Sequence, residues 1–156
     1  MRATSITVNR RIIFGKIQAA VDLAAPGATV TAAAGTYQDG EGTLSIDKDI
    51  IVEGASRSGV TIKPSSSPVC RGVELAASGA TLKNVTVDGN SVAQNGTCNN
   101  NVAVVQILAD NATVQNVTVD GPGDGEAVGI NLFDTDGATI ENALVKNTGK
   151  DGINVR

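Results

Sequence analysis

The strongest metal-binding pattern in the sequence is the acidic stretch "DGPGDGE" at 120–126, which contains Asp120, Asp124 and Glu126. Carboxylate oxygens on a glycine-rich loop are suitable ligands for Ca²⁺, although this spacing does not match an EF-hand loop. A simpler interpretation is a solvated turn, because Asp, Gly and Pro are the usual turn residues. The stretch is therefore a candidate calcium site with an ordinary turn as its alternative.

Two cysteines, Cys70 and Cys98, are the other reactive residues. Cys98 lies in the Asn-rich stretch "NSVAQNGTCNNN", which could fold back over the edge near Cys70. One disulfide would then indicate an oxidising compartment, outside the cell or at its surface, and a secretion leader that has been removed. Two unpaired thiols remain the alternative.

The composition excludes several classes of function. The 156 residues include no His, so a His-based catalytic dyad or metal site is excluded. The net charge of -4 argues against nucleic acid and anionic membrane surfaces, both of which need a basic footprint. No apolar run is long enough to span a bilayer. The length fits a single domain over 1–156.

A ten-residue segment is repeated along the chain. "ATLKNVTVDG" at 80–89 returns as "ATVQNVTVDG" at 112–121, and a looser copy, "ATIENALVKN", occupies 138–147. Apolar and polar residues alternate within each copy and just before it, which predicts three short strands per unit with one buried face. Such a unit cannot bury that face alone, so the repeat predicts a solenoid of units stacked in parallel.

The alternation also predicts which side chains point inward. In the last strand of the units we expect Val87, Val119 and Val145 to stack as one inward column. The apolar positions of the first strand form a second set, which ends at Ile153 and Val155.

An asparagine occupies the fifth position of every copy, at Asn84, Asn116 and Asn142. A sharp corner between two strands needs a residue that tolerates the left-handed region, and Asn does so better than most. Stacked Asn side chains also form hydrogen-bonded ladders along an axis. A structural corner ladder is therefore expected, with glycosylation of the Asn-Val-Thr sites at Asn84 and Asn116 as the alternative.

The amino-terminal half is less regular. Apolar residues from Ile17 to Ala24 follow helical spacing, and Pro26-Gly27 would end that helix. Before it, "TSITV" alternates as a separate strand, and the segments after it predict short strands in one looser turn of solenoid.

The stretch "KIQAAVDLAAPGATVTAAAGTYQ", followed by "LSIDKDIIVEGAS", resembles the opening of proteins of the pectate-lyase-like superfamily. The later units are similar to the short repeats of that superfamily. The resemblance implies an all-β, right-handed parallel β-helix of about five coils. Residues 1–27 would supply an N-terminal strand and a short capping α-helix, and residues 28–156 would supply coils that are open at the C-terminal end.

The same resemblance implies a groove along the outward side of the first strand of each unit. In the family's lyases, acidic residues there hold calcium and an Arg or Lys abstracts a proton; in its hydrolases, Asp residues act as acid and base. The outward positions in this chain are Glu74, Gln106, Asn131 and Asn154. One acid and no base depart from both patterns, so we assign no catalytic residue.

The sequence thus favours a non-catalytic extracellular or surface module that serves as a scaffold or adhesin and contacts polysaccharide. Its open end predicts self-association, for example by addition of the strand Ala3–Val8 of a neighbouring copy, which would build a filament. The alternative is the N-terminal fragment of a carbohydrate-active β-helix enzyme, a polysaccharide lyase or a glycoside hydrolase, with its catalytic residues in later coils.

Overall fold

A computed structural model describes residues 3–8, 16–38, 42–64, 68–92, 98, 102–123 and 125–156. Within this part of the chain the strands form three parallel sheets, which we call A, B and C, and the helix α1 spans Ile17–Leu23. Sheet A contains β1 (Ala3–Val8), β2 (Ala24–Ala32), β5 (Ile51–Gly54), β8 (Thr81–Lys83), β11 (Thr113–Gln115) and β14 (Thr139–Glu141). Sheet B contains β3 (Gly35–Gln38), β6 (Val60–Lys63), β9 (Thr86–Asp88), β12 (Thr118–Asp120) and β15 (Leu144–Lys146). Sheet C contains β4 (Leu44–Ile46), β7 (Arg71–Leu75), β10 (Ala103–Ile107), β13 (Val128–Leu132) and β16 (Ile153–Val155).

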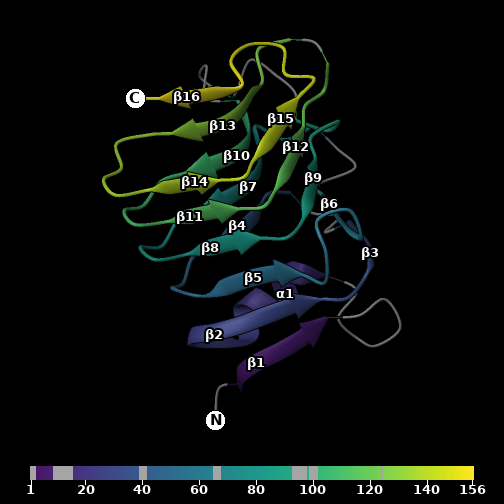
Figure 1. Ribbon diagram of the computed structural model, residues 1–156, viewed down its shortest axis with the longest axis vertical. Helices are drawn as coiled ribbons and strands as arrows, with labels where there is room; N and C mark the ends of the chain where they lie inside the picture. The colour runs from purple at the N-terminus through teal and green to yellow at the C-terminus, as the bar shows by residue number, and fades with distance from the viewer. Residues whose placement is uncertain are drawn as a thin grey trace.

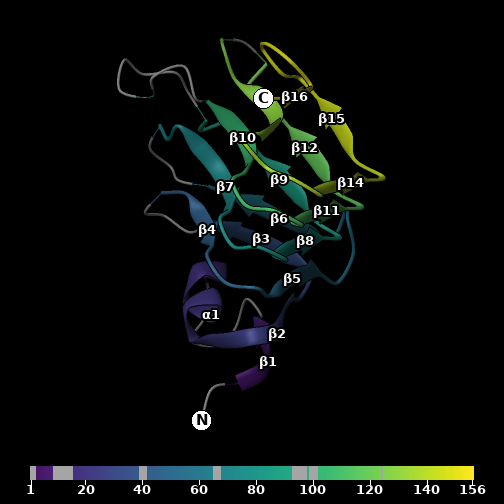
Figure 2. The ribbon, with the colours of Figure 1, turned by 90° about the vertical axis from the view of Figure 1, so that its left-hand side faces the viewer.

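The chain visits the three sheets in the order A, B, C, and does so about five times between β2 and β16 (Figure 1). Each visit is one coil, and each strand pairs in parallel with its counterparts in the coils on either side. The fold is therefore a parallel β-solenoid, as the repeat predicted. Figure 2 shows the coils stacked from β2 to β16, with α1 beside β2 at the N-terminal end.

The core is made of columns of equivalent residues. Val119 is the register partner of both Val87 and Val145, and all three side chains belong to or pack against the buried cluster. The prediction of one inward valine column is thus confirmed. Because the strands are only three to five residues long in most coils, this stacking of one coil on the next supplies the burial that a single coil lacks.

The amino-terminal half is more regular than predicted. It forms two complete coils, β2–β3–β4 and β5–β6–β7, where the sequence favoured one loose turn. The strand β1 is also not separate, because it pairs in parallel with β2. The pairing shifts register between Ala3 and Ser5, opposite the segment of β2 that contains Pro26 and Gly27. Proline cannot donate a ladder hydrogen bond, and glycine favours a bulge, so this irregularity hid the strand that runs through it.

The long side chain of Lys48 fastens α1 to the first coil. The Lys48 ammonium donates to the carbonyl oxygens of Val21, Asp22 and Ala24 at 2.9, 2.7 and 3.3 Å. These carbonyls lie at the C-terminal end of the helix, where free acceptors and the negative end of the helix dipole favour a cation. No described helix has the length and apolar character needed to cross a membrane.

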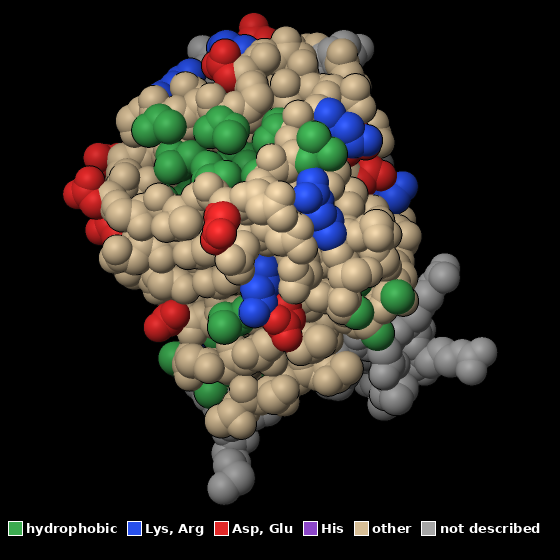
Figure 3. Space-filling view, in the orientation of Figure 1, with side chains coloured by type: hydrophobic (Ala, Val, Ile, Leu, Met, Phe, Trp, Pro, Cys, Tyr) green, Lys and Arg blue, Asp and Glu red, His purple; other side chains and the backbone are tan. Residues whose placement is uncertain are grey.

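Among the described strands, none pairs with the outer side of the last coil. Ile153 and Val155 in β16 are 48% and 72% exposed, whereas their register partners in β13, Ile130 and Leu132, are 0% and 8% exposed. Figure 3 shows apolar side chains gathered at this end of the molecule. The edges of β14, β15 and β16 therefore remain available for a further parallel or antiparallel strand.

Candidate polar site on the outer face of sheet C

The four residues predicted to line a groove lie in one row across sheet C. Glu74 is the register partner of Gln106, Gln106 of Asn131, and Asn131 of Asn154. Ser45 in β4 continues the row beyond Glu74. The structure thus brings the residues together on four successive strands, as the repeat alignment implied.

The row is not an open groove along its whole length. Gln106 is 0% and Asn131 is 4% exposed, and every residue of β10 and β13 is buried. Both faces of these two strands are therefore covered. Only the ends of the row, around Ser45 and Glu74 and around Asn154, are half-buried and reach the surface.

The amides of the row bind one another along the solenoid axis. Asn154 Nδ2 donates to Asn131 Oδ1 at 2.9 Å, and Asn131 Nδ2 donates to Gln106 Oε1 at 3.0 Å. Each amide thus donates towards the N-terminal end. The chain of bonds stops at Gln106, whose buried Nε2 has no partner among the described residues. Its register neighbour Glu74 would be the natural acceptor, but that carboxylate binds elsewhere.

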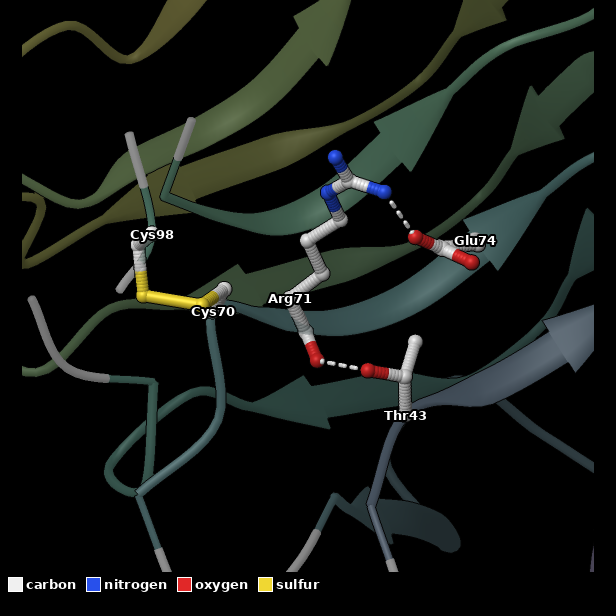
Figure 4. The surroundings of a disulfide bond; sticks show 5 residues. All are labelled: Thr43, Cys70, Arg71, Glu74 and Cys98. Atoms are coloured by element: carbon white, nitrogen blue, oxygen red, sulfur yellow. Dashed lines mark hydrogen bonds and ion pairs between the residues drawn. A yellow bond between two sulfur atoms is a disulfide. The ribbon is translucent and has the colours of Figure 1, made fainter. Parts of the chain in front are cut away.

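Glu74 forms an ion pair with Arg71, the first residue of β7 (Figure 4). Residues three apart in a strand normally point to opposite faces. In β7 both Gly72 and Val73 are buried, which breaks the alternation and brings positions 71 and 74 to the same face. The Thr43 hydroxyl donates to the Arg71 carbonyl oxygen at 2.7 Å and anchors this corner. The sequence reasoning missed Arg71 because it assumed strict alternation.

A disulfide joins Cys70 to Cys98 directly before Arg71, with 5.4 Å between the two Cα atoms (Figure 4). The sequence had left two free thiols open as the alternative. Around the disulfide, the backbone N–H of Val69 donates to the Ser91 carbonyl at 3.0 Å, and that of Ala103 donates to the Cys70 carbonyl at 3.1 Å. These contacts fix the start of β7 and with it the position of the Arg71–Glu74 pair.

Of the three candidate calcium residues, the structure describes Asp120 and Glu126. Asp120 Oδ2 lies 2.8 Å from Lys146 Nζ, and Asp120 Oδ1 accepts from Asn147 Nδ2 at 2.7 Å. Glu126 is exposed, and Asp124 lies outside the described residues. The described residues contain no group of three or more His, Cys, Asp or Glu that could hold a metal ion. Asp120 therefore serves as the partner of a lysine one coil further on.

The corner asparagines form a ladder between sheets A and B. Asn142 Nδ2 donates to Asn116 Oδ1 at 3.0 Å, and Asn116 Nδ2 donates to Asn84 Oδ1 at 2.8 Å. Their φ angles are 49°, 52° and 56°, in the left-handed region that Asn tolerates. The geometry is that of the structural corner that the sequence favoured over a glycosylation site.

Arg57 lies across this ladder and was not anticipated. Its Nε donates to the Thr118 hydroxyl at 2.8 Å, and its Nη1 reaches Asn116 Oδ1 and the Asn142 carbonyl, each at 3.5 Å. The Thr86 hydroxyl donates to the Arg57 carbonyl at 2.9 Å. The Arg57 side chain thus binds the fourth and fifth coils, and its main-chain carbonyl accepts a hydrogen bond from the third.

Replacing Asn116 by Ala should lower the free energy of unfolding by about 1–3 kcal/mol, because the ladder is broken and Ala is strained at a positive φ. Asn116→Gly is the matched control, since Gly accepts this φ and loses only the hydrogen bonds. Urea unfolding of both variants measures the difference. Equal losses in the two variants would show that the left-handed backbone conformation at Asn116 contributes nothing to the difference in stability.

A second column of charge lies on the outer face of sheet B. Lys63 Nζ lies 3.0 Å from Asp88 Oδ2, and Asp88 is the register neighbour of the Asp120–Lys146 pair. Burial raises the pKa of Asp88, but the hydrogen bonds from Lys63 and Asn90 and the Lys63 charge outweigh it and lower the pKa below its ordinary value. The hydrogen bond from Lys146 lowers the pKa of Asp120 more than burial raises it.

Because both folded-state pKa values lie below the unfolded value, the two aspartates stabilise the fold above about pH 4 and lose this contribution as the pH falls through the folded pKa values. We expect Asp88→Asn and Asp120→Asn together to flatten the acid limb of the stability curve by about 0.2–1 kcal/mol per pair. Urea midpoints between pH 6 and pH 2 measure it. The exposed Asp151→Asn is the control, and an acid limb equally steep in the double variant would contradict the assignment.

Taken together, the three parallel sheets and their stacked polar rows define the chain as a β-solenoid protein. Compared with known proteins, the chain matches no family model, no curated protein and no solved structure.

Proposed function

We propose that this chain is a non-catalytic extracellular or surface β-solenoid module that acts as a scaffold or adhesin and contacts polysaccharide. The observation that carries the proposal is the chemistry of the sheet C row. Its one carboxylate, Glu74, is paired with Arg71, and its amides are bound to each other. Glycoside hydrolysis uses two carboxyl groups about 5–10 Å apart on either side of the scissile bond. The row offers one.

The proposed location rests on the disulfide. Cys70 and Cys98 are the two cysteines of the chain, and they are joined. Disulfides persist in oxidising compartments and are reduced in most cytosols. A surface or secreted module is therefore favoured.

We further propose that the chain is a right-handed parallel β-helix of the pectate-lyase-like superfamily and that α1 caps the first coil. Connections between parallel strands of one sheet are right-handed in about 98% of cases, which supports this hand. The capping role is supported by Ile17, Ala20 and Val21, which are buried in the core cluster.

The test of the non-catalytic assignment is direct. The purified chain is incubated with polygalacturonate, alginate and chondroitin sulfate, and ultraviolet absorbance and reducing ends are followed. We expect no product, together with retention of the chain on at least one insoluble polysaccharide. A product whose formation is lost in Glu74→Gln would contradict the non-catalytic assignment, and absence of retention would contradict the contact with polysaccharide.

The open edge of the last coil supports self-association as part of the same proposal. Unpaired strand edges with apolar side chains are templates for pairing with another chain. In the structure β1 is already paired with β2 along one edge, so a neighbouring copy would have to use its other edge. Sedimentation velocity over a range of concentrations should show assembly that Val155→Asp abolishes. A chain that stays monomeric at all concentrations would contradict self-association.

The second candidate is a longer carbohydrate-active β-helix, with its catalytic residues in further coils. The exposure of Ile153 and Val155 favours it, because a following coil would bury both. Expression of a natural gene product that extends past Arg156, tested in the same assays, would separate it from the first candidate.

A further inference from the structure

A hollow of about 420 Å³ lies between α1 and the start of sheet C. Lys16, Gln18 and Asp22 form its helical wall, and Thr43 and Ser45 form the wall on the side of β4. Sites for small ligands usually measure about 300–1,000 Å³. The hollow adjoins the exposed end of the polar row, because Ser45 is the register neighbour of Glu74.

The walls of the hollow are fixed by Gln18. Its Oε1 accepts from the backbone N–H of Ser45 at 2.8 Å, and its Nε2 donates to the Ser45 carbonyl oxygen at 3.1 Å. The side-chain amide thus pairs with the free edge of β4 as a further strand would. The same Nε2 lies 2.9 Å from Asp22 Oδ1 and orients that carboxylate. A site held in this way loses little conformational entropy when a ligand binds.

The polar groups that remain can both donate and accept. In the described part of the chain, neither the Ser45 hydroxyl nor the second carboxylate oxygen of Asp22 takes part in a hydrogen bond. The Thr43 hydroxyl donates to Arg71 and keeps its acceptor lone pairs. Hydroxyl groups of a sugar, each a donor and an acceptor, match this set.

The charges favour a neutral ligand. Lys16 and Asp22 line the hollow with one positive and one negative charge, and the nearby Glu74 is neutralised by Arg71. The chain as a whole carries a net charge of -4, which repels polyanions. We propose that this hollow, rather than the buried middle of the row, binds one unit of a neutral oligosaccharide; the inference rests on the polysaccharide contact proposed above.

The test is an amide NMR titration of the full chain with three probes: cellohexaose, laminarihexaose and hexagalacturonate. We expect shifts at Gln18, Thr43 and Ser45 with a neutral probe. Ser45→Ala should weaken this binding roughly three- to tenfold, the value of one hydrogen bond. Thr113→Ala, an outward threonine of sheet A, is the matched control and should leave it unchanged.

The outcomes separate the two proposals. Shifts confined to Asn154 or to another surface would overturn the hollow as the site and leave the polysaccharide contact standing. Preference for hexagalacturonate would overturn the neutral ligand class. No shift with any of the three probes would overturn both proposals. Unchanged affinity in Ser45→Ala would also refute the site.

Discussion

Replacing Leu82 by Ala is expected to lower the free energy of unfolding by about 2–5 kcal/mol. Leu82 is 0% exposed, and its register partners are Val52 in the coil before and Val114 in the coil after. The deletion leaves a cavity in the middle of an inward column, which the flanking coils cannot close without shifting their own strands. Urea unfolding followed by far-ultraviolet circular dichroism measures the loss.

Leu144→Ala is the matched control. Leu144 is also a leucine in a three-residue strand, but it lies on the outer face and is 49% exposed. Its removal should change the free energy of unfolding by no more than about 0.5 kcal/mol. A similar loss in both variants would contradict the assignment of inner and outer faces.

Removing the disulfide is expected to cost roughly 3–4 kcal/mol, because the cross-link between positions 28 residues apart restricts the unfolded chain. The variant is Cys70→Ala with Cys98→Ala, since Cys98 is buried and a serine there would bury a hydroxyl. Unfolding of this variant is compared with that of the reduced wild-type chain.

The double variant and the reduced wild-type chain should lose the same stability, because reduction breaks the cross-link without any substitution. Two thiols that can be alkylated in the unreduced protein would refute the disulfide. A stable reduced protein with an unchanged urea midpoint would refute its contribution to stability.

The repeated coils could be predicted because their sequence repeats itself in register. A residue such as Val119 occupies the same position in its unit as Val87, so a parallel stack places the two in one column. The corner position of Asn116 follows from the same argument, because Asn is one of the few residues that accept a positive φ.

The two amino-terminal coils could not be predicted in this way because their corners differ. Gly54 ends β5 beside the corner of the next coil, and a Cβ atom at Gly54 would lie 2.2 Å from the Asn84 carbonyl oxygen. Only glycine fits there, and no Asn marks the corner. A search for the Asn-centred repeat therefore passes over this coil.

The long-range side-chain contacts could not be predicted for another reason. Arg57, Gln18 and Lys48 bind residues that are 24 to 85 positions away in the sequence. Local alternation contains no information on such partners. Alternation does predict that Gln106 points to the outer face of sheet C. It does not predict that this outer face is covered.

The parallel stacking of equivalent residues is the central claim, since every row and column described above depends on it. Methyl-to-methyl nuclear Overhauser effects on selectively labelled valines test it most directly. Neighbouring strands of a sheet are about 4.8 Å apart, so Val119 should show cross-peaks to Val87 and to Val145, whereas Val87 and Val145, about 10 Å apart, should show none. Absence of the cross-peak between Val119 and Val87, or Hα–Hα cross-peaks typical of antiparallel pairing between β9 and β12, would contradict the account.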